Sequence, residues 1–185
     1  MEEWKEYKIG NITSVNSEQY SKSDTWEYVN YLDTGNITNN VVEQIQKLFF
    51  AKDEIPSRAK RKVQKDDIIY STVRPNQRHF GYIDKPLSNM LVSTGFAVLT
   101  TNREIADPKY IYYWLTQNNI VDFLHTLGEQ AACAYPSIKP KDIEDLVIRV
   151  PNLCIQKQVS SMLSILDEKI ALNRRINDNL LVMAA

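Results

Sequence analysis

The sequence predicts an α+β fold, in which a domain of strands and short helices over residues 1–150 precedes one long C-terminal helix over residues 151–185. Strands are indicated by short runs of β-branched and aromatic residues that are separated by turn-forming residues. The long helix is indicated by apolar residues that recur every three to four positions from Ile155 to Met183, with no Gly or Pro between them. A chain of 185 residues is long enough to bury a hydrophobic core ahead of this helix.

Segments with the composition of strands recur through the first 150 residues, at 26–31, 68–73, 79–83, 92–99 and 145–150. Trp4, Tyr7 and Ile9 predict a further short strand or turn at the start of the chain. Residues 68–73, Ile-Ile-Tyr-Ser-Thr-Val, form the strongest strand, and Pro75 fixes the loop that follows it. Gly95 indicates a bulge or a close backbone approach within 92–99.

Helix signals begin at Asp107-Pro108, a favoured N-cap followed by a favoured first helical residue. The helical run 109–127 is expected to end at Gly128, a common C-terminal cap. Its apolar stripe changes direction near Asn118, which predicts two short helices or a kink. Residues 141–144 predict one more helical turn.

The long helix carries an apolar stripe of about 40 Å. Either the helix lies on its own domain or it pairs with another helix, and we favour a pair with a second chain because asparagines lie within the stripe. A buried Asn costs stability in a helix pair but fixes its register and number of partners. The residues expected at the helix interface are Val159, Leu163, Leu166, Ile170, Asn173, Ile176 and Leu180.

Several kinds of chemistry lack their sequence signals. There is no Gly-rich phosphate loop, nucleophile elbow or His-Glu-x-x-His motif, and two cysteines and two distant histidines make no metal-ligand spacing. Asp66-Asp67 and the acids at 142–145 could pair for acid–base or metal chemistry, although acids on a solvated loop are far commoner. We therefore expect no catalytic residues, no metal and no cofactor. The start of the chain is unlike a signal peptide, and no apolar run reaches a membrane-span length, so we expect a cytoplasmic protein.

Positive charge is concentrated locally although the net charge is −1. Residues 1–51 hold four Lys/Arg against eight Asp/Glu, whereas residues 52–85 hold nine against five. The second region contains a basic run and then a loop with Arg, Asn and Gln, whose planar groups match base edges. A polar hairpin tip with solvated arginines explains the composition equally well. The candidate DNA-binding residues are Lys60, Arg61, Lys62, Arg74, Asn76, Gln77, Arg78 and His79.

Nearly the whole chain resembles the DNA specificity subunits of type I restriction–modification systems. Residues 4–10, Trp-Lys-Glu-Tyr-Lys-Ile-Gly, look like the start of the domain, and residues 67–76 are similar to its central strand and following loop. Residues 108–115 look like its aromatic helix. The most specific likeness is to the proline-leading conserved helix, over 150–159 and 166–177. Asn152 departs from this pattern, because a second proline is usual there, and this affects the way the chain enters the helix.

The resemblance implies a mixed-sheet target recognition domain, residues 1–150, and a conserved helix, residues 151–185, for dimerisation, spacing and methyltransferase docking. Full members carry two such units, each reading half of a split site in duplex DNA. The implied partners are double-stranded DNA, methyltransferase (modification) subunits, a restriction subunit, and a second copy or second specificity unit through the helix. S-adenosylmethionine and ATP belong to those other subunits.

With one unit, the chain is expected to be a natural half-subunit or a piece of a longer protein. The alternatives are a catalytic fragment of a DNA methyltransferase or nuclease, and a helix-mediated protein-interaction module.

Overall fold

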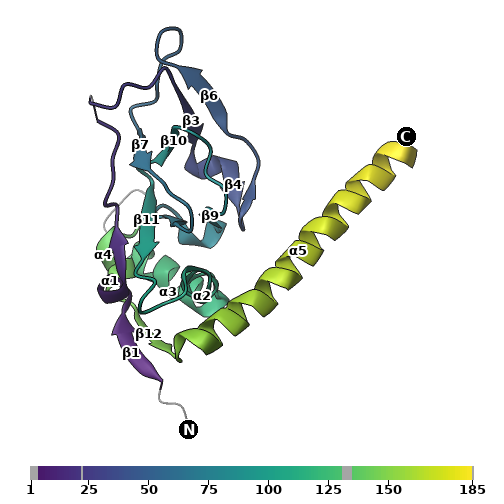
Figure 1. Ribbon diagram of the computed structural model, residues 1–185. Helices are drawn as coiled ribbons and strands as arrows, with labels where there is room; N and C mark the ends of the chain where they lie inside the picture. The colour runs from purple at the N-terminus through teal and green to yellow at the C-terminus, as the bar shows by residue number, and fades with distance from the viewer. Residues whose placement is uncertain (1–3, 22, 131–134, 185) are drawn as a thin grey trace.

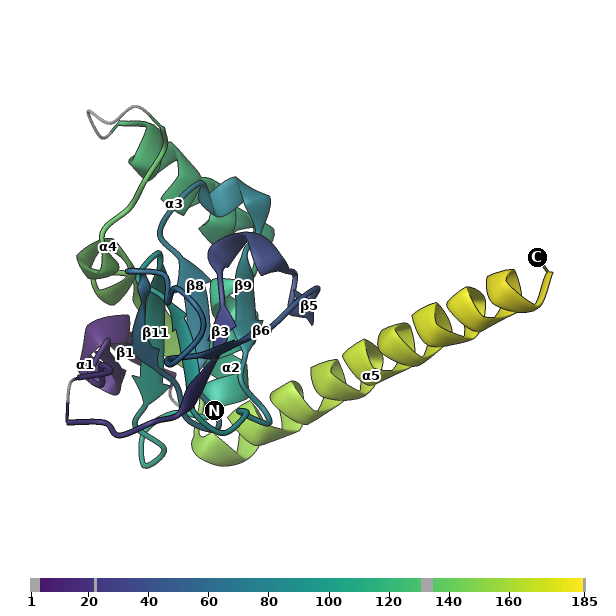
Figure 2. The same cartoon turned by 90° about the horizontal axis from the view of Figure 1, so that it is seen from above.

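The computed structural model describes residues 4–21, 23–130 and 135–184. Two four-stranded sheets within these residues lie one beyond the other, with short helices at the end of the molecule that carries the N-terminus (Figure 1). One long helix leaves that end and runs away from the sheets, as the view from above also shows (Figure 2). The α+β class predicted from the sequence is confirmed.

The central sheet is antiparallel and has the order β2 (Thr13–Val15), β11 (Phe96–Thr101), β8 (Ile68–Ser71) and β9 (Phe80–Tyr82). All four residues of β8 are buried. Its two faces serve different cores: Ile68 and Tyr70 pack with the helices, and Ile69 packs towards the second sheet. A strand covered on both faces reads as a continuous apolar run, and this is why β8 was the clearest strand in the sequence.

The distal sheet has the order β6 (Gln46–Phe49), β3 (Tyr28–Leu32), β10 (Met90–Ser93) and β7 (Ala59–Lys62). β10 runs parallel to β3 and antiparallel to β7, so this sheet is mixed. Its buried side chains, among them Val29 and Leu91, form a core of their own.

A third set of elements closes the N-terminal end and the side of the molecule. β1 (Lys5–Lys8) pairs antiparallel with β12 (Val147–Val150), next to α1 (Ile9–Ile12) and α4 (Pro140–Glu144). The 3₁₀ helix η1 (Thr34–Asn36) leads into a small hairpin.

The hairpin consists of β4 (Ile37–Thr38) and β5 (Val41–Val42). α2 (Pro108–Leu115) and α3 (Asn118–Glu129) are separate helices, which confirms the break expected near Asn118. The Asp107 carboxylate accepts the Tyr110 backbone N–H at 2.9 Å, so the predicted N-cap is also confirmed.

Two details of the predicted element pattern are wrong. Residues 92–99 belong to two strands, β10 and β11, that enter different sheets on either side of a turn at Thr94-Gly95. Gly128 does not end its helix, because α3 continues through Glu129. A Cβ on Gly128 would lie 3.1 Å from the Ser137 backbone nitrogen, so glycine serves close packing there. The strands between residues 37 and 49 were not predicted.

The long helix α5 (Leu153–Ala184) has an identifiable start. Asn152 accepts the Ile155 backbone N–H at 3.0 Å, which is an N-cap bond. The buried Gln156 side chain accepts the Asp107 N–H at 2.9 Å and donates to the Pro151 carbonyl at 2.8 Å. The Asn that replaces a usual proline therefore caps the helix. Across the described ranges, no helix combines the length and apolarity needed to span a membrane.

Candidate nucleic-acid and partner interfaces

The loop after β8 has an unusual backbone that gives it a defined shape. The 3₁₀ helix η2 (Pro75–Gln77) is flanked by Arg74 with φ 47° and Arg78 with φ 57°. Left-handed backbone is unfavourable for a residue with a Cβ, so the surrounding structure must hold it. The Arg74 N–H donates to the Pro136 carbonyl at 2.9 Å, and the Arg78 N–H donates to the Pro75 carbonyl at 3.0 Å. Buried Pro75 anchors the centre of the loop.

Three of the predicted side chains in this loop are presented to solvent. Arg74, Asn76 and Gln77 are exposed. The Arg74 guanidinium lies 5.9 Å from the centroid of the Tyr135 ring, a cation–π contact that restricts it without using its hydrogen-bond donors. These three side chains can meet the edge of a base without first breaking a bond within the described part of the chain.

Arg78 and His79 are instead held by hydrogen bonds to neighbouring elements. The Arg78 guanidinium donates to Asn118 Oδ1 at 2.9 Å, at the start of α3. His79 Nδ1 lies 2.6 Å from the Ile37 carbonyl oxygen, so it donates this hydrogen bond. Both side chains are half-buried. Their contacts position the loop against its neighbours, and a base contact by either one would replace a bond that already exists.

The second predicted cluster, Lys60 to Lys62, is a strand rather than a solvated run. It forms most of β7, at an edge of the distal sheet (Figure 1), whereas η2 follows β8 of the central sheet. Lys60 is exposed. Lys62 Nζ pairs with Asp24 Oδ1 at 2.6 Å and lies 5.4 Å from the Trp26 ring centroid.

Arg61 has a different environment from its two neighbours. Its Nε and Nη1 atoms are buried and make no hydrogen bond within the described residues, and burial lowers the pKa of the guanidinium. Of the three basic side chains of β7, Lys60 is therefore the one that is available to a phosphate.

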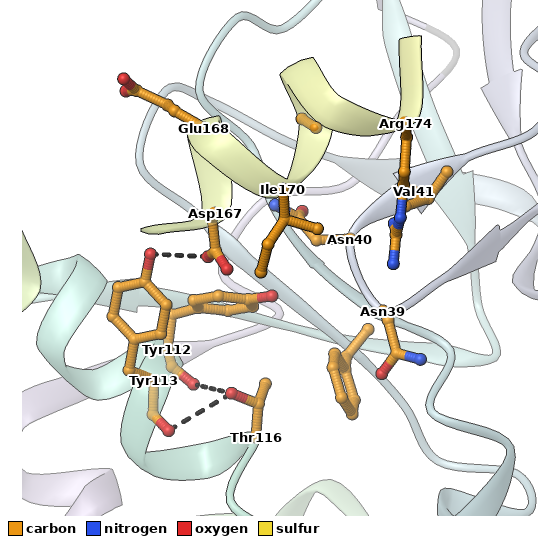
Figure 3. Close-up of a pocket in the computed structure, with 12 residues that line it drawn as sticks. Asn39, Asn40, Val41, Tyr112, Tyr113, Thr116, Asp167, Glu168, Ile170 and Arg174 are labelled. Atoms are coloured by element: carbon orange, nitrogen blue, oxygen red, sulfur yellow. Dashed lines mark hydrogen bonds between the residues drawn. The ribbon is translucent and has the colours of Figure 1, made fainter. Parts of the chain in front are cut away.

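A groove of about 460 Å³ separates α5 from the domain (Figure 3). One wall is the β4–β5 hairpin with Asn39 and Val41, and the other is α5 with Asp167, Glu168 and Arg174. At its base, the Tyr113 hydroxyl donates to Asp167 Oδ2 at 2.8 Å. Burial, with the adjacent Asp167 carboxylate, raises the pKa of Tyr113 to about 12. The α5 wall of the groove thus carries two acidic side chains and one arginine.

The apolar stripe of α5 is left largely in solvent by the domain that precedes it, although Ile170 lines the groove (Figure 3). The side chains that meet the domain come from the polar side of the helix: Gln156 and Ser160 are buried, and Ser164 lies 3.3 Å from the Tyr113 hydroxyl. On the stripe, Leu166 is 59% exposed and Leu180 is 57% exposed. Of the remaining predicted interface residues, Val159, Ile170, Asn173 and Ile176 are also exposed, and Leu163 is half-buried.

The described part of the domain covers the first turns of the helix and leaves the apolar residues beyond them in solvent. The stripe is thus available to a second helix.

The acidic residues considered for catalysis have structural partners. Asp66 pairs with Arg103 at 2.7 Å and accepts the Tyr82 hydroxyl at 2.6 Å. Asp67 is buried and accepts the Thr100 hydroxyl at 2.6 Å. No group of three or more His, Cys, Asp or Glu that could hold a metal is found among the described residues, and Cys133 lies outside them.

The β4–β5 hairpin is a candidate site element that sequence reasoning missed. It lies between the η2 loop and the groove, and its backbone is bonded to residues 78–80. Its sequence signal was the pair Asn39-Asn40, because Asn favours the left-handed turn of a tight hairpin.

Comparisons with known proteins place these features in a family. The model of the type I restriction modification DNA specificity domain matches residues 1–181. The type I restriction enzyme HindI specificity subunit of Haemophilus influenzae is 29% identical over 180 residues, which cover 97% of this chain and 39% of that protein.

Solved structures show the same fold. The HsdS subunit from Thermoanaerobacter tengcongensis superposes with a TM-score of 0.76 at 22% identity, covering 94% of this chain and 44% of that one. The type I restriction–modification S subunit from M. genitalium superposes with a TM-score of 0.61 at 17% identity, covering 97% and 43%. The chain thus spans about two fifths of the length of these relatives. The resemblance drawn from sequence motifs is confirmed: this chain belongs to the family of type I restriction modification DNA specificity domains.

Proposed function

We propose that this chain binds one half of a split duplex-DNA site as the specificity component of a type I restriction–modification system. In this proposal, residues 1–150 read the DNA, and residues 151–185 pair with a second specificity unit and dock the modification subunits. Methyl transfer and cleavage belong to the methyltransferase and restriction subunits that the chain directs. The observation that carries the proposal is the η2 loop, which presents Arg74, Asn76 and Gln77 on a rigid backbone.

Titration of the full chain against a selected and a scrambled duplex, at several salt concentrations, tests DNA reading. We expect tighter binding to the selected duplex and an affinity that falls with salt on both, because neutralised phosphates release counterions. DNA binding that changes with neither the sequence nor the salt concentration would favour the alternative of a protein-interaction module. Transfer of labelled methyl groups, or cleavage, by the chain alone would favour the catalytic alternative.

The exposed stripe of α5 supports pairing with a second copy. An antiparallel pair with Ile170 opposite Asn173 of the second copy also sets Leu163 opposite Leu180. The same alignment brings Asp167 of each helix beside Arg174 of the other, so charges at the edge of the seam are complementary. An isologous pair makes each of these contacts twice.

Light scattering of three variants tests the pair. Leu166→Lys with Ile170→Lys should give a folded monomer, because it buries like charges in the seam. Arg174→Glu should weaken the pair by placing two acids side by side, and adding Asp167→Lys in the same chain should restore it. Tyr113→Phe controls for the hydroxyl contact to Asp167. A parent chain that stays monomeric at all working concentrations would contradict self-association.

A further inference from the structure

The tip of the β4–β5 hairpin is exposed beside the η2 loop, and on its other side it forms one wall of the groove against α5. A two-residue connection joins the strands, with φ 47° at Asn39 and 62° at Asn40, as in a type I′ turn. The next two residues are Val41 and Val42, which are 46% and 43% exposed. The tip thus exposes two β-branched residues next to two asparagines. This composition is unusual for a turn whose sole role is to reverse the chain direction.

Backbone hydrogen bonds fix this tip to the end of the η2 loop. The Asn39 N–H donates to the Arg78 carbonyl at 2.9 Å, and the Asn40 N–H donates to the Phe80 carbonyl at 3.0 Å. Behind them, a Cβ on Gly81 would lie 2.5 Å from Ile37 Cδ1 and 3.1 Å from Asn40 Oδ1, so a larger residue there would make the Ile37 and Asn40 side chains shift. The tip therefore has one position relative to Arg74, Asn76 and Gln77.

The two asparagines of the turn have different roles. Asn40 Oδ1 accepts the Tyr82 backbone N–H at 2.7 Å, so its side chain holds the hairpin in place. The Asn39 side chain is exposed and makes no hydrogen bond within the described residues. Figure 3 shows it on the hairpin side of the groove, across from Tyr113 and Asp167. The left-handed turn favours Asn, Asp or Gly at position 39, but it does not require that the side-chain amide be free of hydrogen bonds.

We infer that Asn39 is a specificity-determining residue that reads an adenine next to the bases met by the η2 loop; the inference rests on the proposed function. An asparagine amide presents a donor and an acceptor side by side, and these match the N6 and N7 positions of adenine in the major groove. The left-handed turn projects the amide, and the bonds to residues 78–80 hold it in register with Arg74.

Selection from a randomised duplex library, with sequencing of the DNA bound by the full chain, tests this inference. The variants are Asn39→Asp, which keeps the shape and removes the donor, and Asn39→Gly, which keeps the left-handed turn and removes the amide. Both should lose the adenine preference at one position and keep the rest of the selected motif. Affinity for the parent's motif should fall by roughly 5- to 150-fold, the range for losing one bidentate base contact.

The outcomes separate this inference from the function on which it rests. A parent chain that selects no motif would overturn both. A parent that selects a motif, with both Asn39 variants selecting the same motif at equal affinity, would overturn the inference alone and leave Asn39 as a turn residue. Equal weakening on all sequences would also overturn it, because that pattern marks a backbone contact. Asn40→Ala is a matched reference, since it disturbs the tip through the Tyr82 bond.

Discussion

Replacing Arg74 by glycine should separate the stability of the η2 loop from its ability to read DNA. An arginine at φ 47° carries a conformational cost of about 1–2 kcal/mol, which glycine avoids. Against this gain stand about 0.5–1 kcal/mol for the greater chain entropy of glycine and about 0.5–1 kcal/mol for the lost contact with the Tyr135 ring. The net change in the free energy of unfolding is therefore about zero, and the melting temperature should stay within about 4 °C of the parent.

The effect of Arg74→Gly on DNA binding should be far larger. If Arg74 meets a guanine with both donors, its loss costs about 1–3 kcal/mol on the selected duplex and much less on scrambled DNA. Arg74→Lys is the matched control, because lysine keeps the charge but lacks the planar fork. It should retain most binding to scrambled DNA and fail to restore the preference for the selected duplex.

Fluorescence titration of both variants against both duplexes measures these losses, with thermal unfolding as the check on folding. Equal losses on the two duplexes, or full discrimination with lysine, would refute the reasoning. Arg74 would then be a phosphate contact, and base reading would belong to another loop.

Three further outcomes follow from other contacts. Lys60→Ala should weaken binding to every sequence alike and lower the salt slope by about one unit, read from affinities at several salt concentrations. The hydrogen bonds from Lys62 and from the Ser21 N–H lower the pKa of Asp24 below its unfolded-state value of about 4. The Lys62–Asp24 pair therefore stabilises the fold above about pH 4, and this stabilisation is lost as the pH falls through the pKa of Asp24 in the folded protein. The difference in melting temperature between Lys62→Met and the parent should accordingly shrink below about pH 4. Gln156→Ala should cost about 1–3 kcal/mol in chemical denaturation, because it strands the Asp107 N–H and the carbonyls that the amide now satisfies; an unchanged midpoint would contradict the role given to this amide.

Sequence reasoning recovered the elements whose signals are local. The β8 strand is buried on both faces and reads as an apolar run, and Asp107 is the N-cap that marks the start of α2. The strands of β4–β5 are only two residues long, and they exist because residues 78–82 bond to them from forty residues away. Likewise, the single strand expected at 92–99 splits because each half pairs in a different sheet, which is information held by the partner strands.

The candidate site was predictable in composition but not in the availability of its side chains. The η2 loop was found from its Arg, Asn and Gln content. The sequence could not reveal that Arg78 bonds Asn118, or that Lys62 pairs with Asp24 thirty-eight residues earlier. Those partners are set by how the sheets and helices meet. Because of them, fewer basic side chains are free to contact DNA than the composition suggests.

The anchoring of α5 at its first turns makes the helix a lever arm. Gln156 and the Tyr113–Asp167 hydrogen bond hold α5 against the domain, and the helix extends about 25 Å beyond Asp167 at 1.5 Å per residue. A tilt of about 10° about this last contact moves the far end by about 4 Å, close to one base-pair step of 3.4 Å. If this end fixes where a second recognition unit sits, small changes in the buried amide contacts would alter the spacing between half-sites as effectively as changes in helix length.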